Sequence, residues 1–275
     1  MSRKTRILQG AAVNFVKAVP RRGLSRFIGA LARTQASNVV IPSFVKAFKI
    51  DVCEAELGLE CYNTLEDFFT RRLKPGARKI AGDPSVLASP VDGVLQDWGR
   101  VVEKCVIHVK GQPLNVAELT GGKSAQFRDG GFTVHYLSPR DYHWIHAPIE
   151  GRITGWHHTK GDYLPVFPKS LEEFGPVFTR NERMTVFLDT PLGSMAVVMV
   201  AAMGVADIGL PFARDPIAAG SHIPHSPITV ERGGDLGVFR LGSTVVVIWS
   251  SELIAPIEGA TGRHLKMGEA FARVA

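Results

Sequence analysis

Short apolar stretches separated by turn-forming residues fill the chain from residue 86 onward, and this pattern constrains the fold more than any other feature. Gly, Pro and Asp stand between the stretches, as expected for strands bounded by turns. The 28 Gly and 17 Pro also disfavour a helix bundle. We therefore predict an α+β fold that is mainly β, with a compact antiparallel β core and N-terminal helices. The predicted strands are 91–95, 106–109, 132–137, 184–188, 195–200 and 244–249.

The chain is long enough to bury such a core. It has 275 residues, of which 45% are hydrophobic and 21% charged. This composition excludes disordered and fibrous proteins. Single domains commonly hold roughly 100 to 250 residues. We therefore expect one principal domain over 51–275, preceded by a distinct segment at 1–50.

The first 50 residues differ from the rest in charge. They contain ten Lys or Arg and no Asp or Glu, whereas 51–275 contains 22 basic and 26 acidic residues. Apolar residues fall at helical spacing over 24–31, between Arg22, Arg26 and Arg33. This is typical of an amphipathic helix at a membrane interface, with cations for head groups and an apolar face for acyl chains. A helix packed on its own domain would show the same pattern, so both interpretations stay open.

The N-terminal residues do not resemble a secretion signal. Gln9, Asn14 and Lys17 interrupt any continuous apolar core there, so we predict no signal peptide and a protein that stays in the cytoplasm. The most apolar run, 194–206, is shorter than the roughly 20 residues of a spanning helix and is better explained as a buried strand. The three cysteines show neither a close pair nor metal-ligand spacing, which is typical of reduced thiols.

Two further segments have recognisable local signals. Residues 64–73 are predicted to form a helix that Thr64 caps and that ends before Pro75 and Gly76. Residues 210–235 are rich in Pro and Gly and are predicted to be a loop.

Asp92, His143 and His146 are the first candidates for chemistry. Asp92 lies in a Pro-Val-Asp-Gly turn, where a carboxylate often only caps its own turn. His143 and His146 are three residues apart, so they could bind zinc or supply a general base. Two histidines are too few ligands for a zinc site. We therefore predict no metal and favour acid–base chemistry.

Ser243 is the candidate nucleophile. It follows Gly242 at the entrance of the strand predicted at 244–249. Glycine lacks a Cβ and can adopt strained backbone angles that expose its carbonyl to a neighbouring hydroxyl. A serine hydroxyl needs an activating base, and a histidine held by a carboxylate supplies one. An Asp92, His146, Ser243 triad is therefore chemically sensible, although an ordinary turn would also explain the motif.

Taken together, the motifs resemble the pyruvoyl-dependent phosphatidylserine decarboxylases, in their bacterial short form. The resemblance covers about 60–250, and the ordered set with its Leu-Gly-Ser-Thr cleavage motif is highly specific. Its motifs are Ser-Pro-Val-Asp-Gly-Val at 89–94, Tyr-Leu-Ser-Pro-Arg-Asp-Tyr-His-Trp-Ile-His at 136–146, Arg-Asn-Glu-Arg at 180–183 with Thr-Pro-Leu-Gly at 190–193, and Gly-Val-Phe-Arg-Leu-Gly-Ser-Thr at 237–244.

This resemblance implies that Asp92, His146 and Ser243 are a self-processing triad that cuts the chain between Gly242 and Ser243. The Ser243 hydroxyl would attack the Gly242 carbonyl, and the resulting ester would eliminate to dehydroalanine and hydrolyse to a pyruvoyl group. The products are a large chain, 1–242, and a small chain, 243–275. A Schiff base between the pyruvoyl group and phosphatidylserine would then lose carbon dioxide and release phosphatidylethanolamine. His143 is matched to substrate contact or proton transfer.

The resemblance also implies where the protein works. Its expected partners are phosphatidylserine and an anionic membrane surface, and its expected location is peripheral, at the cytoplasmic face of the cell membrane. A homodimer is expected by resemblance only. The chain departs from the family pattern at 163–168, which affects the substrate pocket, and at Trp144, where a basic residue is common.

Three other functions are alternatives to the decarboxylase. A serine hydrolase would use the same triad on an external ester or peptide, but the chain lacks a Gly-x-Ser-x-Gly elbow around Ser243. A non-enzymatic membrane-binding scaffold would keep one uncleaved chain. Nucleic-acid binding is least favoured, because the basic segment has no Tyr or Trp on which bases could stack.

Overall fold

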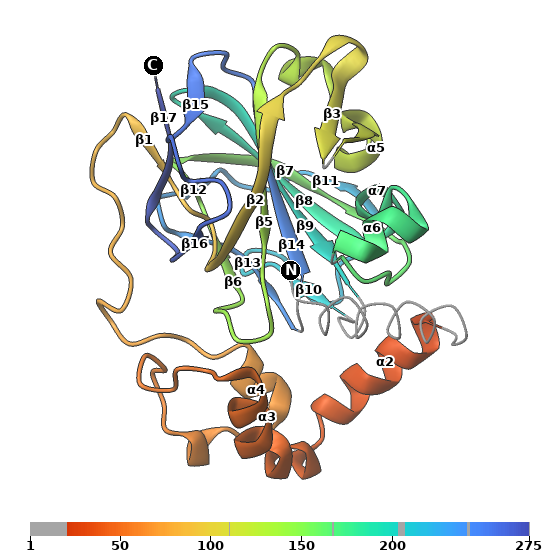
Figure 1. Cartoon of the computed structure of the whole chain (residues 1–275), viewed down its shortest axis with the longest axis vertical. Helices are drawn as coiled ribbons and strands as arrows, with labels where there is room; N and C mark the ends of the chain where they lie inside the picture. The colour runs from red at the N-terminus through yellow and green to blue at the C-terminus, as the bar shows by residue number, and fades with distance from the viewer. Residues whose placement is uncertain (1–20, 110, 167, 203–206, 241–242, 275) are drawn as a thin grey trace.

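A nine-stranded antiparallel sheet forms the centre of the protein in the computed structural model (Figure 1). The structure describes residues 21–109, 111–166, 168–202, 207–240 and 243–274. The order of the sheet is β11-β7-β8-β9-β14-β5-β2-β16, and β12 pairs with β7. The strands are β2 (Gly93–Arg100), β5 (Gly131–Tyr136), β7 (Gly151–Thr159), β8 (Arg183–Thr190), β9 (Gly193–Ala201), β11 (Gly220–His222), β12 (Ile228–Val230), β14 (Ser243–Trp249) and β16 (His264–Leu265).

Three smaller sheets surround this centre. β6 (Trp144–His146) and β10 (Ile208–Gly209) flank β13 (Asp235–Phe239), while β1 (Val86–Ala88) and β15 (Ile254–Pro256) flank β17 (Ala270–Val274). β3 (Val106–Val109) pairs with β4 (Gln112–Asn115). Short helices connect the strands: η3 (Glu103–Cys105), α5 (Val116–Thr120), η4 (Ala125–Phe127), α6 (Pro168–Phe174) and α7 (Val177–Arg180).

β14 is the most completely buried strand of the large sheet. It pairs with β9 on one edge and β5 on the other, and Val245, Val246, Val247 and Ile248 are all 0% exposed. Both of its faces are therefore covered, which explains why its sequence is a continuous β-branched run instead of an alternating one.

The predicted α+β, mainly β fold is confirmed, and each of the six predicted strand segments overlaps an observed strand. The prediction that 210–235 is only loop is wrong in part, because β11 and β12 lie within it and pair with β7. β7 was not predicted. It contains a bulge at Gly155, where a Cβ would lie 2.6 Å from the carbonyl oxygen of His222. The bulge and the adjacent histidines interrupt the alternation that would have signalled a strand.

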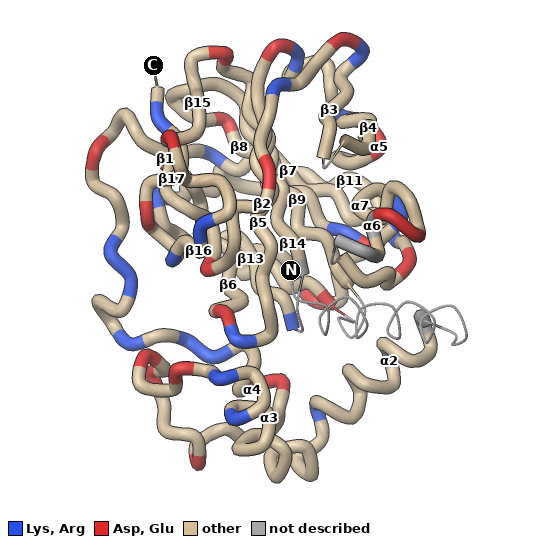
Figure 2. Tube along the Cα trace, in the orientation of Figure 1, with Lys and Arg blue, Asp and Glu red and all other residues tan. Residues whose placement is uncertain are grey.

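Residues 21–69 lie below the β core as a group of short helices (Figure 1). They are α2 (Arg21–Ala32), η1 (Gln35–Val40), α3 (Ile41–Phe48), η2 (Leu59–Cys61) and α4 (Leu65–Phe69). An extended segment then runs along one side of the core to β1, and Figure 2 shows Lys and Arg along its first part. None of the described helices is both long and apolar enough to cross a bilayer.

The helix predicted at 64–73 exists but is shorter than expected. Its start is as predicted, because Thr64 Oγ1 accepts a hydrogen bond from the Asp67 amide and Asp67 accepts one from the Thr64 amide. It ends at Phe69, since the following Thr70 leaves the helical conformation. Leu73 instead forms an antiparallel bridge to Ala55, which explains why 70–73 is not helical.

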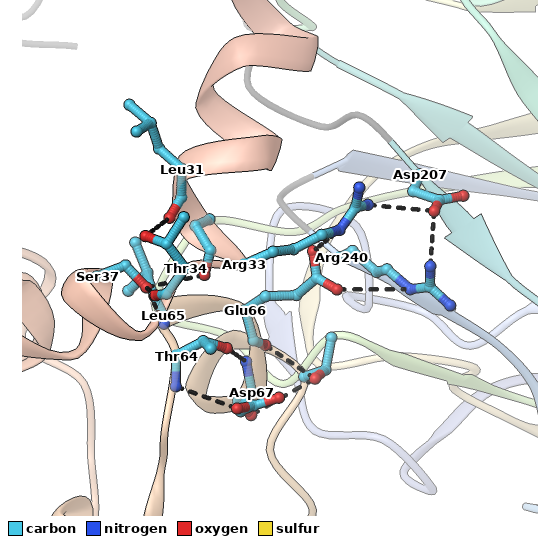
Figure 3. A network of polar contacts seen from close by, with 12 residues as sticks. Leu31, Arg33, Thr34, Ser37, Thr64, Leu65, Glu66, Asp67, Asp207 and Arg240 are labelled. Carbon is cyan, nitrogen blue, oxygen red and sulfur yellow. Dashed lines mark hydrogen bonds and ion pairs between the residues drawn. The ribbon is translucent and has the colours of Figure 1, made fainter.

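A group of ion pairs joins the N-terminal helices to the core (Figure 3). Just after α2, Arg33 lies 2.8 Å from Glu66 of α4 and 3.2 Å from Asp207 of the core. Arg240 lies 2.6 Å from the same Asp207 oxygen and also pairs with Asp215. Through Asp207, these contacts link the end of α2 to Arg240, which lies two positions before Gly242 in the sequence.

Candidate active site

Pairing between strands brings the predicted site residues into one region. β6 carries His146 and pairs with β13, where the chain approaches Ser243. The Phe239 amide donates to the His143 carbonyl at 3.0 Å, and the His146 amide donates to the Pro90 carbonyl at 2.9 Å. The two histidines therefore lie between the Asp92 turn and the segment that leads to Ser243.

Ser243 is the first residue of β14. Its backbone pairs with Ala201 of β9, and the next residue, Thr244, pairs with Tyr136 of β5. The chain leaves β5 at Tyr136 and reaches His143 seven residues later. Gly242 and the Ser243 side chain lie outside the described residues. The described part of the site consists of the groups that surround the start of β14.

His146 is held so that one ring nitrogen is available as a base. Its Nδ1 lies 2.8 Å from the Gly233 carbonyl oxygen, which can only accept a hydrogen bond, so Nδ1 carries the hydrogen and Nε2 is the basic atom. Nε2 is buried and has no hydrogen-bond partner among the described residues. The ring stacks on Tyr142 at 5.6 Å. Burial lowers the pKa of His146 below its ordinary value, so the imidazole is neutral at pH 7.

His143 is more deeply buried than His146. It is 0% exposed, and its ring lies 3.9 Å from that of Phe69 at the end of α4. Burial lowers the pKa of His143 to about 3. Neither ring nitrogen makes a hydrogen bond of normal geometry with a described residue, although the Asp141 backbone lies near enough to favour protonation slightly. Buried polar atoms are normally paired, so His143 is a candidate to contact a reacting group.

Asp92 is committed to an ion pair. Its Oδ1 accepts from Arg78 Nε at 2.9 Å and from the Met267 amide at 2.7 Å, and its Oδ2 pairs with a second Arg78 nitrogen. Arg78 also pairs with Glu54 at 2.8 Å. Burial alone would lower the pKa of Arg78, but the hydrogen bonds to Asp92 and Glu54 outweigh it and raise the pKa. No hydrogen bond between Asp92 and His146 occurs in the described structure.

Gly93 allows the Asp92 turn to approach the large sheet. A Cβ at this position would lie 2.5 Å from the Tyr136 carbonyl oxygen, which is backbone and cannot move aside. The glycine of the Pro-Val-Asp-Gly turn therefore has a packing role, and it lets Asp92 lie close to the end of β5.

Sequence reasoning missed a second carboxylate at the site. Asp235 Oδ1 lies 3.3 Å from His146 Nδ1. Arg72 holds Asp235 with two hydrogen bonds, of 3.1 and 2.7 Å, and its guanidinium lies 3.2 Å from the centre of the Trp144 ring. Trp144, one of the departures from the family pattern, thus supports this pair. Nothing in the sequence links positions 72 and 235, because their contact depends on how the segment after α4 packs against β13.

Tyr163, in the other departure, and His158 form a separate group. Tyr163 is buried and donates to Glu182 at 2.8 Å, while His158 lies 3.1 Å from the other oxygen of Glu182. Within the described ranges, no three His, Cys, Asp or Glu side chains are grouped so as to hold a metal ion. These residues therefore stabilise the fold near 163–168 and do not form part of the site around β6.

A polar cavity of about 170 Å³ adjoins Asp92 between the N-terminal helices and the core. Its lining includes cations, carboxylates and the phenol of Tyr142, whose pKa burial raises to about 12. The lining residues are Lys49, Asp51, Glu54, Arg71, Leu73, Arg78, Asp92, Arg140, Asp141, Tyr142, His264 and Lys266.

Comparison with known proteins assigns the chain to a family. The family model described as phosphatidylserine decarboxylase matches 65–273. Proteins named phosphatidylserine decarboxylase proenzyme are similar over most of the chain. One from Anaeromyxobacter sp. (strain K) is 38% identical over 250 residues, covering 86% of this chain and 88% of the relative. One from Brevibacillus brevis is 35% identical over 271 residues, covering 94% and 95%.

The enzyme class follows from this match, which spans the fold and the site just described. The chain is a decarboxylase, a carboxy-lyase. It belongs to the phosphatidylserine decarboxylase family.

Proposed function

We propose that this enzyme converts phosphatidylserine to phosphatidylethanolamine and carbon dioxide, using a pyruvoyl group made from its own Ser243. The observation that carries the proposal is the pair of buried imidazoles, His143 and His146, beside the segment that leads to β14. They have ring nitrogens that meet no hydrogen-bond partner among the described residues. The relatives named phosphatidylserine decarboxylase proenzyme support both the substrate and the maturation.

Maturation would begin with proton transfer from Ser243 to His146. As Nε2 takes the hydroxyl proton, the oxygen bonds to the Gly242 carbonyl carbon and the peptide C–N bond breaks, which leaves an ester and a free amine on Ser243. Loss of the α-proton then breaks the Cβ–O bond, giving a carboxylate on Gly242 and dehydroalanine at 243. Water replaces the nitrogen as ammonia, and a pyruvoyl group remains. Asp92 would favour the imidazolium that forms on His146, because its negative charge raises the pKa of that ring.

The residues around the start of β14 fit a pyruvoyl group. The ring nitrogens of His143, and Nε2 of His146, are buried and meet no hydrogen-bond partner among the described residues, so they can contact a polar group. The group would supply a carbonyl that accepts the electrons released when a carboxylate leaves. His143 would contact the substrate or hold the proton that replaces the carboxylate. Burial lowers the pKa of His143, so its ring stays neutral until the charged carboxylate of the substrate binds beside it.

The cavity beside Asp92 has the chemistry that a phospholipid head group requires. Phosphatidylserine presents a phosphate, an ammonium and a carboxylate. The cavity offers both cations, such as Arg71 and Arg140, and carboxylates, such as Asp51. Such a lining would exclude acyl chains, so the lipid tails would stay outside the cavity, toward the exposed apolar residues of the N-terminal helices.

The first experiment follows the reaction itself. Purified protein incubated with phosphatidylserine labelled in its carboxyl group should release labelled carbon dioxide and form phosphatidylethanolamine. His143→Ala should still mature, because His146 remains as the base, but should release carbon dioxide at least about a hundredfold more slowly if His143 moves the proton. Normal release by a fully matured His143→Ala protein would remove His143 from the reaction. An intact wild-type chain without lipid turnover would overturn the whole proposal.

We also propose that the N-terminal helices attach the enzyme to an anionic membrane surface. Phe27 and Leu31 of α2 are 60% and 49% exposed, and Val39 of η1 is 75% exposed. Large apolar side chains that face water together are typical of a membrane-contacting surface. Arg33, expected from the sequence to meet lipid, is instead committed to Glu66 and Asp207. Arg22 and Arg26, whose side chains lie outside the described residues, remain the cations of this proposal.

Vesicle binding tests this surface. Phe27→Ser and Leu31→Ser should each weaken binding to vesicles of phosphatidylglycerol and phosphatidylcholine by about tenfold in high salt, since burying such a side chain is worth about 1.5–3 kcal/mol. Arg22→Gln with Arg26→Gln should weaken binding mainly in low salt, where head-group attraction is unscreened. Ile223→Ser is the matched control, because Ile223 is 78% exposed but lies between β11 and β12. Equal losses for Phe27→Ser and Ile223→Ser would remove this role from α2.

A further inference from the structure

Among the described residues, Asp235 is the carboxylate that lies at ion-pair distance from His146. Nδ1 of His146 donates to the Gly233 carbonyl oxygen at 2.8 Å and lies 3.3 Å from Asp235 Oδ1, so the carboxylate lies at ion-pair distance from the ring. Asp92, the carboxylate expected from the sequence, has its oxygens occupied by Arg78 and the Met267 amide. The nearest negative charge therefore comes from β13 and not from the Asp92 turn.

Asp235 is itself held in place. Arg72 donates to both of its carboxylate oxygens, and the Arg72 guanidinium rests on the Trp144 ring, two residues before His146. A carboxylate fixed by a two-point hydrogen bond keeps a constant orientation toward its neighbour. The β6–β13 pairing, in which Asp235 is opposite His146, fixes the separation of the two backbones.

We infer that Asp235 is the positioning residue that orients His146 and stabilises its imidazolium while Ser243 is activated; the inference rests on the proposed self-cleavage. Asp92 would then act on His146 only through its charge at longer range. The Gly233 carbonyl and Asp235 have different roles. The carbonyl selects the tautomer of His146, whereas the Asp235 carboxylate supplies the full negative charge that balances a protonated ring. Asp235 would touch neither the substrate nor the reacting carbonyl.

The pH profile of self-cleavage should reveal this role. In the part of the chain that the structure describes, four titratable or charged groups act on His146: Asp235 on β13, Arg72 after α4, Tyr142 before β6 and Asp92 in its turn. Cleavage needs the neutral imidazole, so its rate falls as the pH drops through the pKa of His146. Asp235 raises that pKa and Arg72 lowers it. Removing Asp235 should therefore move the acid limb to lower pH, and removing Arg72 should move it to higher pH.

The experiment uses the full precursor made by cell-free synthesis, with conversion into two chains followed by intact mass from pH 5 to 9. Asp235→Asn should cut the plateau rate by about ten- to a hundredfold, less than the ~10⁴ lost when a triad carboxylate also sets the tautomer, and Asp235→Glu should recover most of it. Arg72→Gln should move the acid limb in the opposite direction to Asp235→Asn. Asp189→Asn, which breaks the exposed Arg152–Asp189 pair on β7 and β8, is the matched control and should mature normally.

The outcomes separate the inference from the proposed function. An Asp235→Asn precursor that is cut at the wild-type rate with an unchanged profile would overturn the inference alone. Equal rate losses and the same direction of shift for Asp235→Asn and Arg72→Gln would also overturn it, because they would mean that the ion pair only holds the fold. A wild-type precursor that is never cut would instead refute the self-cleavage on which the inference rests.

Discussion

Ser243→Ala should leave one intact chain of 275 residues, with no small chain and no decarboxylation. The native precursor should yield two species, 1–242 and 243–275, the latter 33 residues long and without a free amino terminus. The difference is complete because alanine has no hydroxyl to attack the Gly242 carbonyl, and no other described group can make the ester. Intact-mass measurement on the purified proteins gives the result directly.

The control for this substitution lies at the other end of the same strand. Ser250 follows Trp249, the last residue of β14, so Ser250→Ala makes an identical chemical change far from the cleavage point. It should mature like the native chain. Cleavage of Ser243→Ala at the same bond would show that the hydroxyl is not the nucleophile.

Arg78→Met should lower the free energy of unfolding by about 3–5 kcal/mol, because it leaves a buried charge uncompensated. The side chains of Arg78 and Asp92 are 6% and 7% exposed, and Arg78 also neutralises Glu54. Without Arg78, the Asp92 carboxylate keeps only the Met267 amide as a partner. The measurement is urea unfolding in the Ser243→Ala background, where the chain stays in one piece.

Two comparisons make the stability result specific. The double variant Arg78→Met with Asp92→Asn should recover part of the loss, since the buried carboxylate is then neutral. Arg152→Met removes an exposed partner of Asp189, with side chains 58% and 56% exposed, and should cost no more than about 1 kcal/mol. If Arg78→Met cost as little as Arg152→Met, the Asp92–Arg78 pair would have no role in holding the fold.

A strand could be predicted from the sequence where its burial requires a recognisable pattern of apolar residues. The run at 244–249 is apolar at every position because both faces of β14 are covered, so its position was evident. β7 pairs with three strands, yet the bulge between Ile153 and Gly155 and its half-buried polar residues obscure the strand pattern in the sequence. The hydropathy pattern of a sequence indicates which residues are buried but not which strands pair. The core strands could therefore be predicted, whereas β7 could not.

The site divides in the same way. Residue chemistry and family resemblance pointed to Asp92, His143, His146 and Ser243, and the structure gathers the first three and the Ser243 backbone into one region. The partners of these residues were not predictable. Arg78 reaches Asp92 and Arg72 reaches Asp235 across 14 and 163 positions of sequence, and such contacts depend on how the segment after α4 crosses the core.

The central position of β14 gives the proposed self-cleavage a consequence for the lifetime of the enzyme. The strand would open the small chain, yet the large chain would supply both of its neighbours, β9 and β5. The precursor carries all three strands in one chain, so its folding does not depend on protein concentration. After the cut, the same arrangement can be regained only by an encounter between two molecules, one of them 33 residues long and largely apolar in its first strand. The mature enzyme would thus persist through the slowness of its unfolding, and each molecule would have a single opportunity to fold.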